Sequence, residues 1–209
     1  MEKIKTALLF AGQGSQYIGM GKDFYDQYPY VKQMYDEASS ILGYDLADIC
    51  FNANDKISLT LYTQPAILVT SCAILEVLKR EFQINYDVVA GFSLGEYTAL
   101  YASGIFSFQQ IISLINKRAL YMDAAAKANP GAMAAIIGLN REALEAICLH
   151  IGEVVIANYN SPNQLVISGT TSGVSQAIEQ AKASGAKRAI PLNVSGGFHS
   201  FLMHEAAVK

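Results

Sequence analysis

The sequence is poor in the residues that several protein classes depend on. It has only three histidines in 209 residues, and its basic residues occur at most in adjacent pairs. The lack of a basic cluster argues against nucleic acid as a partner. Charged residues make up only 16% of the chain and apolar residues 52%, so the composition is not that of a disordered protein and allows a buried core.

Cysteine is also scarce, with Cys50, Cys72 and Cys148 far apart and no C-x-x-C pair. This spacing indicates three buried free thiols in a reducing, cytoplasmic environment rather than a disulfide framework. His199 and His204 have no carboxylate or cysteine at ligand spacing, so we expect no metal site.

Membrane and secretion signals are lacking as well. No apolar run approaches the length of a membrane span. The short apolar stretch after "MEKIK" ends in a glycine-rich loop without a signal-peptide cleavage site. We therefore expect neither a leader sequence nor a membrane partner.

What the sequence does contain is an alternation of strand and helix patterns over residues 1–128. The predicted strands cover 4–10 and 86–90, and the predicted helices lie within 21–42, 61–82, 94–102 and 107–128. The 61–82 segment is apolar almost all round and is expected to be buried. Alternation of this kind is typical of an α/β fold with a parallel sheet, here a hydrolase-like large subdomain.

The alternation of strand and helix patterns changes at Pro130-Gly131, and this Pro-Gly pair predicts a domain boundary. The elements predicted after it follow in the order β-α-β-β-α-β. The strands are at 132–137, 154–159, 164–168 and 187–192. The helices are at 141–149 and from a cap at Thr171 or Ser172 to 185. That order predicts a ferredoxin-like small subdomain, residues 129–195, inserted into the large one. Residues 196–209 would then return to the large subdomain.

The stretch "VVAGFSLGEYTAL" (88–100) places Ser93 between Gly91 and Gly95 at a strand-to-helix turn. This is the arrangement of a nucleophile elbow, in which the glycines let strand and helix approach and the helix N-terminus favours negative charge near the serine. The alternative is a tight Gly-Ser turn without chemistry.

A serine nucleophile needs a base, and His199 is the best candidate. It follows a Gly-Gly turn at a domain junction, where catalytic residues are favoured, whereas His150 ends a helix of the small subdomain. The alternative is an ordinary histidine at a helix start. No loop carboxylate between Ser93 and His199 is placed to orient the imidazole, so either a backbone carbonyl orients it or the orienting group lies beyond residue 209.

Arg118 is the second candidate for a functional side chain. It falls on the same predicted helix face as the apolar residues Ile111, Ile115 and Met122. A guanidinium on a buried face needs an anion, which indicates a fork for a substrate carboxylate. Alternatively, Arg118 extends outward to solvent or pairs with a protein carboxylate.

The glycine-flanked loop "AGQGSQ" (11–16) follows the first predicted strand. Its backbone N–H groups can point at an anion. Together with the elbow, the loop predicts an oxyanion hole made by the N–H groups of Gln13 and Leu94.

Taken together, these residues resemble the malonyl-CoA:acyl-carrier-protein transacylase family of fatty-acid synthesis. The matching motifs, in the family's order, are "FAGQGSQYIGMG" (10–21), "YTQPAI" (62–67), "GFSLGEYTAL" (91–100), "KRALYM" (117–122), "NYNSPNQLVISG" (158–169) and "VSGGFHSFLM" (194–203).

The resemblance implies that Ser93 carries the malonyl group from coenzyme A to the phosphopantetheine thiol of acyl carrier protein, with His199 as the base and no cofactor. It implies that Arg118 binds the malonyl carboxylate and that Gln13 and Leu94 form the oxyanion hole. It also implies further residues along the pocket or the pantetheine path: Gln64, Met122, Asn160 and Phe198.

Two departures from the family pattern stand out. Phe92 occupies the place of a histidine that is usual in the family but is not the base. The family's domain continues well past residue 209, so the resemblance also implies a C-terminally truncated chain whose large subdomain is incomplete. A truncated sheet exposes an edge and apolar helix faces. That exposure would favour association of the chain and puts its activity in question.

Two rival functions stay open at this point. The first is a serine hydrolase or thioesterase, in which water replaces the second thiol. A patatin-like Ser-Asp hydrolase is disfavoured because the sequence contains no Asp-Gly dipeptide. The second rival is an inactive fragment that retains only coenzyme A or carrier-protein binding.

Overall fold

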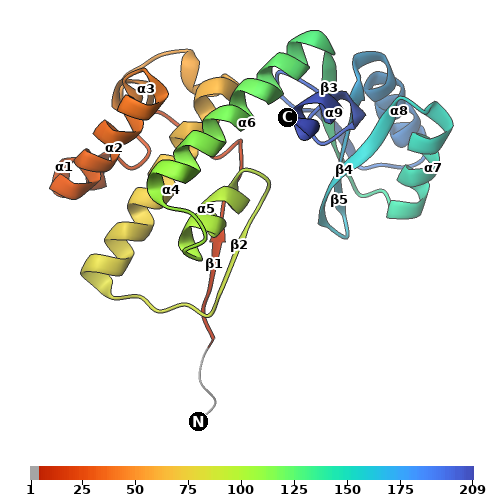
Figure 1. Ribbon diagram of the computed structural model, residues 1–209. Coiled ribbons are helices and arrows are strands. Elements are labelled where there is room, and N and C mark those ends of the chain that lie inside the picture. Colours follow the sequence, from red (N-terminus) through yellow and green to blue (C-terminus); the bar gives the residue numbers. More distant parts are fainter. Residues whose placement is uncertain (1–4) are drawn as a thin grey trace. The chain divides into compact units, whose positions relative to one another are not determined.

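The computed structural model describes residues 5–209, which divide into two compact units (Figure 1). Unit 1 comprises the described residues up to Ala119, and unit 2 comprises Leu120–Lys209. The division falls within a single long helix, α6 (Phe108–Ala128). Part of the first predicted strand, at Ile4, lies outside the described residues.

Unit 1 is built from two strands and several helices. Its elements are β1 (Ala7–Phe10), α1 (Lys22–Gln27), α2 (Pro29–Leu42), α3 (Leu46–Phe51), the short 3-10 helix η1 (Lys56–Ser58), α4 (Thr60–Phe82), β2 (Val88–Gly91), α5 (Gly95–Ala102) and the first part of α6. The two strands pair in parallel, with Ala7 opposite Val88 and Phe10 opposite Gly91 (Figure 1). The predicted α/β class with a parallel sheet is therefore confirmed.

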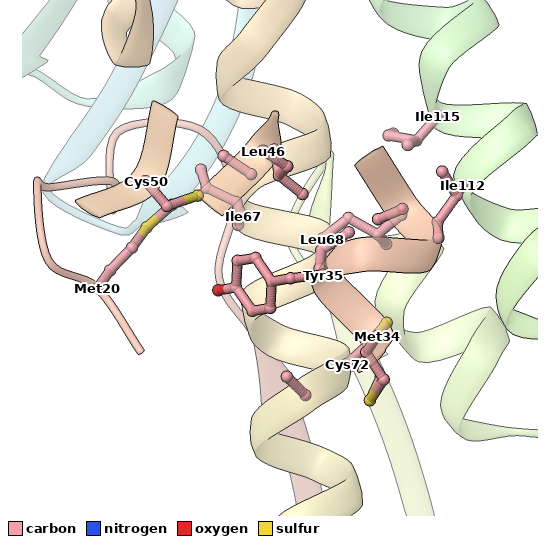
Figure 2. Close-up of a cluster of buried hydrophobic side chains, with 14 of the residues drawn as sticks. Met20, Met34, Tyr35, Leu46, Cys50, Ile67, Leu68, Cys72, Ile112 and Ile115 are labelled. Carbon is pink, nitrogen blue, oxygen red and sulfur yellow. The ribbon is translucent and has the colours of Figure 1, made fainter. Parts of the chain in front are cut away.

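Helix α4 forms the middle of the unit 1 core. The consecutive residues 66–69 are all buried, as expected for a helix that is apolar on every side. Figure 2 shows Ile67 and Leu68 of this helix beside Tyr35 and Ile112 in the same cluster. The core therefore joins α4 to α2 and α6.

The expectation that no apolar segment reaches the length of a membrane span is wrong. Helix α4 has 23 residues, and its most apolar window has a mean hydropathy of 1.5. However, 67% of that window is buried inside the protein. Its apolar surface is thus taken up by packing against neighbouring helices.

All three cysteines are free and buried, as the sequence predicted. Burial raises the pKa of Cys50 to about 12 and that of Cys148 to about 11. Burial also raises the pKa of Cys72. The thiolate form, which is the reactive one, is therefore strongly disfavoured at neutral pH.

Unit 2 contains a four-stranded antiparallel sheet in the order β4-β5-β3-β6. Its elements after α6 are β3 (Gly131–Ile137), α7 (Arg141–Ile151), β4 (Val154–Ser161), β5 (Gln164–Thr170), α8 (Thr171–Ala183), β6 (Arg188–Pro191), the 3-10 helix η2 (Phe201–Met203) and α9 (His204–Val208). From β3 to β6 the elements follow the order predicted from the sequence. Helices α7 and α8 and the sheet enclose an apolar cluster that includes Ile136, Leu144 and Ile167.

Several predicted boundaries are corrected by hydrogen bonding. The N-cap of α8 is Thr170, the last residue of β5, and not Thr171 or Ser172. The Thr170 hydroxyl accepts a hydrogen bond from the Gly173 N–H. Strand β4 extends through Asn160 to Ser161, so the turn begins later than predicted. Helix α3, capped by Asp45, was not predicted, since six residues are too few to show a helical period.

Candidate active site

Ser93 occupies a strained turn between β2 and α5. Its φ is +51°, a left-handed conformation that is uncommon for a residue with a side chain. A Cβ at Gly91 would lie 2.0 Å from the Gly95 carbonyl carbon, and one at Gly95 would lie 2.1 Å from the Phe10 carbonyl oxygen. Both flanking glycines are therefore required by close backbone approach, which is the geometry of a nucleophile elbow.

Replacing Gly91 or Gly95 by alanine is expected to destabilise the protein by at least about 3 kcal/mol, because backbone atoms cannot yield as side chains do. The matched control is Gly43→Ala. Gly43 is the C-cap residue of α2, with a φ of +79° and open space around its Cβ position. We therefore expect Gly43→Ala to lower the free energy of unfolding by only about 1–2 kcal/mol. Urea denaturation measures all three, and equal losses would contradict the steric argument.

The glycine-rich loop after β1 lies directly against this elbow. A Cβ at Gly12 would be 2.6 Å from the Phe92 carbonyl oxygen, and the Phe92 N–H donates to the Phe10 carbonyl at 3.0 Å. Within the loop, the Ser15 hydroxyl donates to the Gly12 carbonyl at 2.8 Å. The loop thus has an ordered backbone beside the serine.

The two N–H groups proposed for an oxyanion hole remain available in this arrangement. Within residues 5–209, neither the Gln13 N–H nor the Leu94 N–H donates a hydrogen bond to a protein group. Leu94 is the N-cap residue of α5, and the Gln13 side chain donates to the Thr60 hydroxyl at 3.2 Å. That bond ties the loop to the start of α4, while the oxyanion role itself stays a prediction.

Arg118 points from α6 toward Ser93. Its Nη1 donates to Gln64 Oε1 at 2.6 Å, and its Nη2 donates to Ser93 Oγ at 3.3 Å. Among the described residues, no carboxylate lies within ion-pair distance of the guanidinium. The two alternatives, an arginine directed to solvent and one paired with a protein carboxylate, are both contradicted.

Arg118 is partly buried and forms no ion pair among the described residues. Ile111 and Ile115, on the same helix face, are fully buried. Burial lowers the pKa of Arg118 from its ordinary value, an effect that the nearby Tyr97 phenol opposes. The Glu96 carboxylate also opposes the effect of burial, although it forms no ion pair with the guanidinium. Because an arginine side chain stays protonated in proteins, a half-buried cation without a direct ion pair among the described residues is held beside the serine.

Tyr97 is a residue of this site that the sequence analysis missed. The Arg118 Cζ lies 5.2 Å from the centre of its ring. A usable signal was present, because Tyr97 follows Ser93 by four residues, about one turn into the helix that leaves the elbow.

His199 belongs to unit 2 and also has a left-handed backbone, with a φ of +58°. It precedes Ser200, whose hydroxyl accepts from the Leu202 N–H and donates to the Gly197 carbonyl. His199 therefore lies just outside the 3-10 helix η2, not within a helix. Its neighbour Phe198 is buried in an apolar cluster that includes Ala126 and Met203.

The structure brings together five of the residues singled out from the sequence within unit 1: Gln13, Gln64, Ser93, Leu94 and Arg118. The other four belong to unit 2. There Met122 packs against the same cluster as Phe198, and Asn160 is exposed on β4. The predicted pocket roles of Met122, Asn160 and Phe198, and the base role of His199, stay predictions.

Comparison with known protein families shows the family to which the chain belongs. The family model of the acyl transferase domain matches residues 7–209. The chain belongs to the acyl transferase family. The more specific resemblance to malonyl-CoA:acyl-carrier-protein transacylases is confirmed by its relatives.

Two curated relatives of this acyl transferase chain carry the name malonyl CoA-acyl carrier protein transacylase. The one from Bacillus subtilis is 50% identical over 98% of this chain and 66% of its own length. The one from Haemophilus influenzae is 45% identical over 97% of this chain and 67% of its own length. The chain thus spans about two thirds of the length of these relatives.

Solved structures of high similarity include MCAT from Streptococcus pneumoniae, with 50% identity and a TM-score of 0.91. Another is a malonyl-transacylase in complex with a type II polyketide synthase acyl-carrier protein, with 41% identity and a TM-score of 0.94. Each match covers 98% of this chain and 68% of the solved chain.

Proposed function

We propose that this acyl transferase moves a malonyl group from coenzyme A to the phosphopantetheine thiol of acyl carrier protein, in fatty-acid synthesis. The 3.3 Å between Arg118 Nη2 and Ser93 Oγ carries the proposal. In a malonyl thioester, one methylene separates the free carboxylate from the carbonyl that is attacked. A fork beside the serine can therefore hold that carboxylate while Ser93 reacts.

In the proposed first half-reaction, Ser93 Oγ attacks the thioester carbonyl and His199 accepts the serine proton. The N–H groups of Gln13 and Leu94 stabilise the oxyanion. Collapse of the intermediate breaks the carbon–sulfur bond, and His199 returns the proton to the departing coenzyme A thiolate. In the second half-reaction the carrier thiol attacks the malonyl-Ser93 ester in the same manner, which gives ping-pong kinetics.

The proposed architecture follows the predicted division. Residues 1–128 belong to a hydrolase-like large subdomain, residues 129–195 form a ferredoxin-like insert, and residues 196–209 return to the large subdomain. The antiparallel order β4-β5-β3-β6 supports the insert. The three buried free thiols support a cytoplasmic location, and the chemistry requires no cofactor.

Mixing the protein with malonyl-CoA is expected to produce a malonyl adduct, detectable by intact mass. Addition of acyl carrier protein bearing its phosphopantetheine arm is expected to remove the adduct and to place malonate on the carrier. Carrier protein without the arm is the matched control and leaves the adduct in place. If the adduct were lost to water as fast as it is lost to the armed carrier protein, the protein would be a hydrolase. A folded protein that forms no adduct would contradict an acyl transfer function.

A further inference from the structure

We infer that Tyr97 is a positioning residue, which fixes the plane of the Arg118 guanidinium and thereby favours acyl groups that carry a carboxylate. The inference rests on the proposed function of Arg118 as the carboxylate fork. It concerns a side chain that neither attacks the substrate nor accepts a proton, and that acts through Arg118.

Two neutral groups from different helices hold the guanidinium. The Tyr97 ring, on α5, has its centre 5.2 Å from the Arg118 Cζ. The Gln64 side chain, on α4, is fully buried and accepts from Nη1 at 2.6 Å. Tyr97 itself packs against the unit 1 core, so the ring presents a supported surface to the cation.

One hydrogen bond alone would not define the direction of the fork. The Nη2 bond to Ser93 Oγ must open when a substrate carboxylate binds in the proposed function, and with only the Nη1 bond to Gln64 the guanidinium plane could then turn about that bond. An aromatic ring within about 6 Å attracts the cation and limits this motion. Together the two contacts leave the Nη2 edge directed at Ser93 Oγ, so a substrate carboxylate held by this edge lies beside the serine during acylation.

The neutrality of both groups matters for the chemistry. A protein carboxylate in either place would orient Arg118 equally well, but it would also neutralise the guanidinium. The ring and the amide orient the cation and leave its charge for the substrate. This explains how a half-buried arginine can lack an ion pair among the described residues.

The test compares single-turnover acylation by malonyl-CoA and acetyl-CoA in Tyr97→Leu and Tyr97→Phe. We expect Tyr97→Leu to lower the malonyl-to-acetyl ratio of maximal acylation rates about 3- to 30-fold. Tyr97→Phe keeps the ring and is expected to restore the ratio to within about twofold. The matched control is Tyr101→Leu, since Tyr101 lies one turn further along α5 and contacts Glu76 and Lys79; its ratio is expected to be that of the wild type.

A second readout does not depend on turnover. Nitrogen-15 spectra of arginine-labelled protein report how freely each guanidinium rotates. We expect hindered rotation of Arg118 in the wild type and in Tyr97→Phe, and faster rotation in Tyr97→Leu. An unchanged ratio and unchanged rotation in Tyr97→Leu would overturn the positioning role alone, whereas a wild type that accepts neither acyl group, with Arg118 still hindered, would overturn the proposed function.

Discussion

Replacement of Ser93 by alanine is expected to abolish the malonyl adduct and to lower the transfer rate by about 10⁴-fold or more. Removal of the nucleophile from a serine protease lowers kcat by about 10⁶-fold, so about 10⁴-fold is a lower limit. In the proposed mechanism Gln13, Leu94 and Arg118 would still bind and polarise a thioester, but they offer no atom to acylate. Steady-state transfer to the carrier thiol and intact mass measure the two effects separately.

The strained backbone at Ser93 supplies a control for this experiment. Alanine at a φ of +51° is as strained as serine, so Ser93→Ala is expected to keep the wild-type stability. Ser93→Gly relieves the strain and is expected to stabilise the fold by about 1 kcal/mol while remaining inactive. A malonyl adduct on Ser93→Ala, or a loss of folding in both variants, would contradict Ser93 as the acylated residue of a strained elbow.

The elbow could be predicted from the sequence because its determinants are local. An apolar strand, two glycines around Ser93 and a following helix are all visible within thirteen residues. Arg118 could be predicted for a similar reason, since its position relative to Ile111 and Ile115 follows from the period of one helix. Local geometry of this kind does not depend on how distant segments pack.

The contacts that hold Arg118 could not be derived in the same way. Gln64 is 54 residues away in sequence from Arg118, and it lies on a helix that is buried on nearly all sides. Such a helix has no polar face from which the direction of one side chain could be inferred. The same all-round apolarity explains why α4, a helix of membrane-spanning length, gave no amphipathic signal of its place in the core.

Replacement of Arg118 by alanine is expected to impair malonyl transfer far more than acetyl transfer. Loss of one partner from a desolvated, hydrogen-bonded charge pair costs about 2–5 kcal/mol, which corresponds to roughly 30- to 5,000-fold in kcat/KM. Acetyl-CoA has no carboxylate for the fork, so its kcat/KM is expected to change by only a few-fold. Acylation of Ser93 by each thioester, followed by intact mass over time, gives the ratio directly.

Arg118→Lys separates the charge of the side chain from its shape. Lysine keeps the positive charge but offers no planar pair of donors, so it cannot hold Gln64 Oε1 and a substrate carboxylate together as Nη1 and Nη2 can. We therefore expect malonyl transfer between that of the alanine variant and the wild type. Equal losses for malonyl-CoA and acetyl-CoA in Arg118→Ala would mean that the 3.3 Å contact with Ser93 supports the serine itself, and would remove the basis for a carboxylate fork.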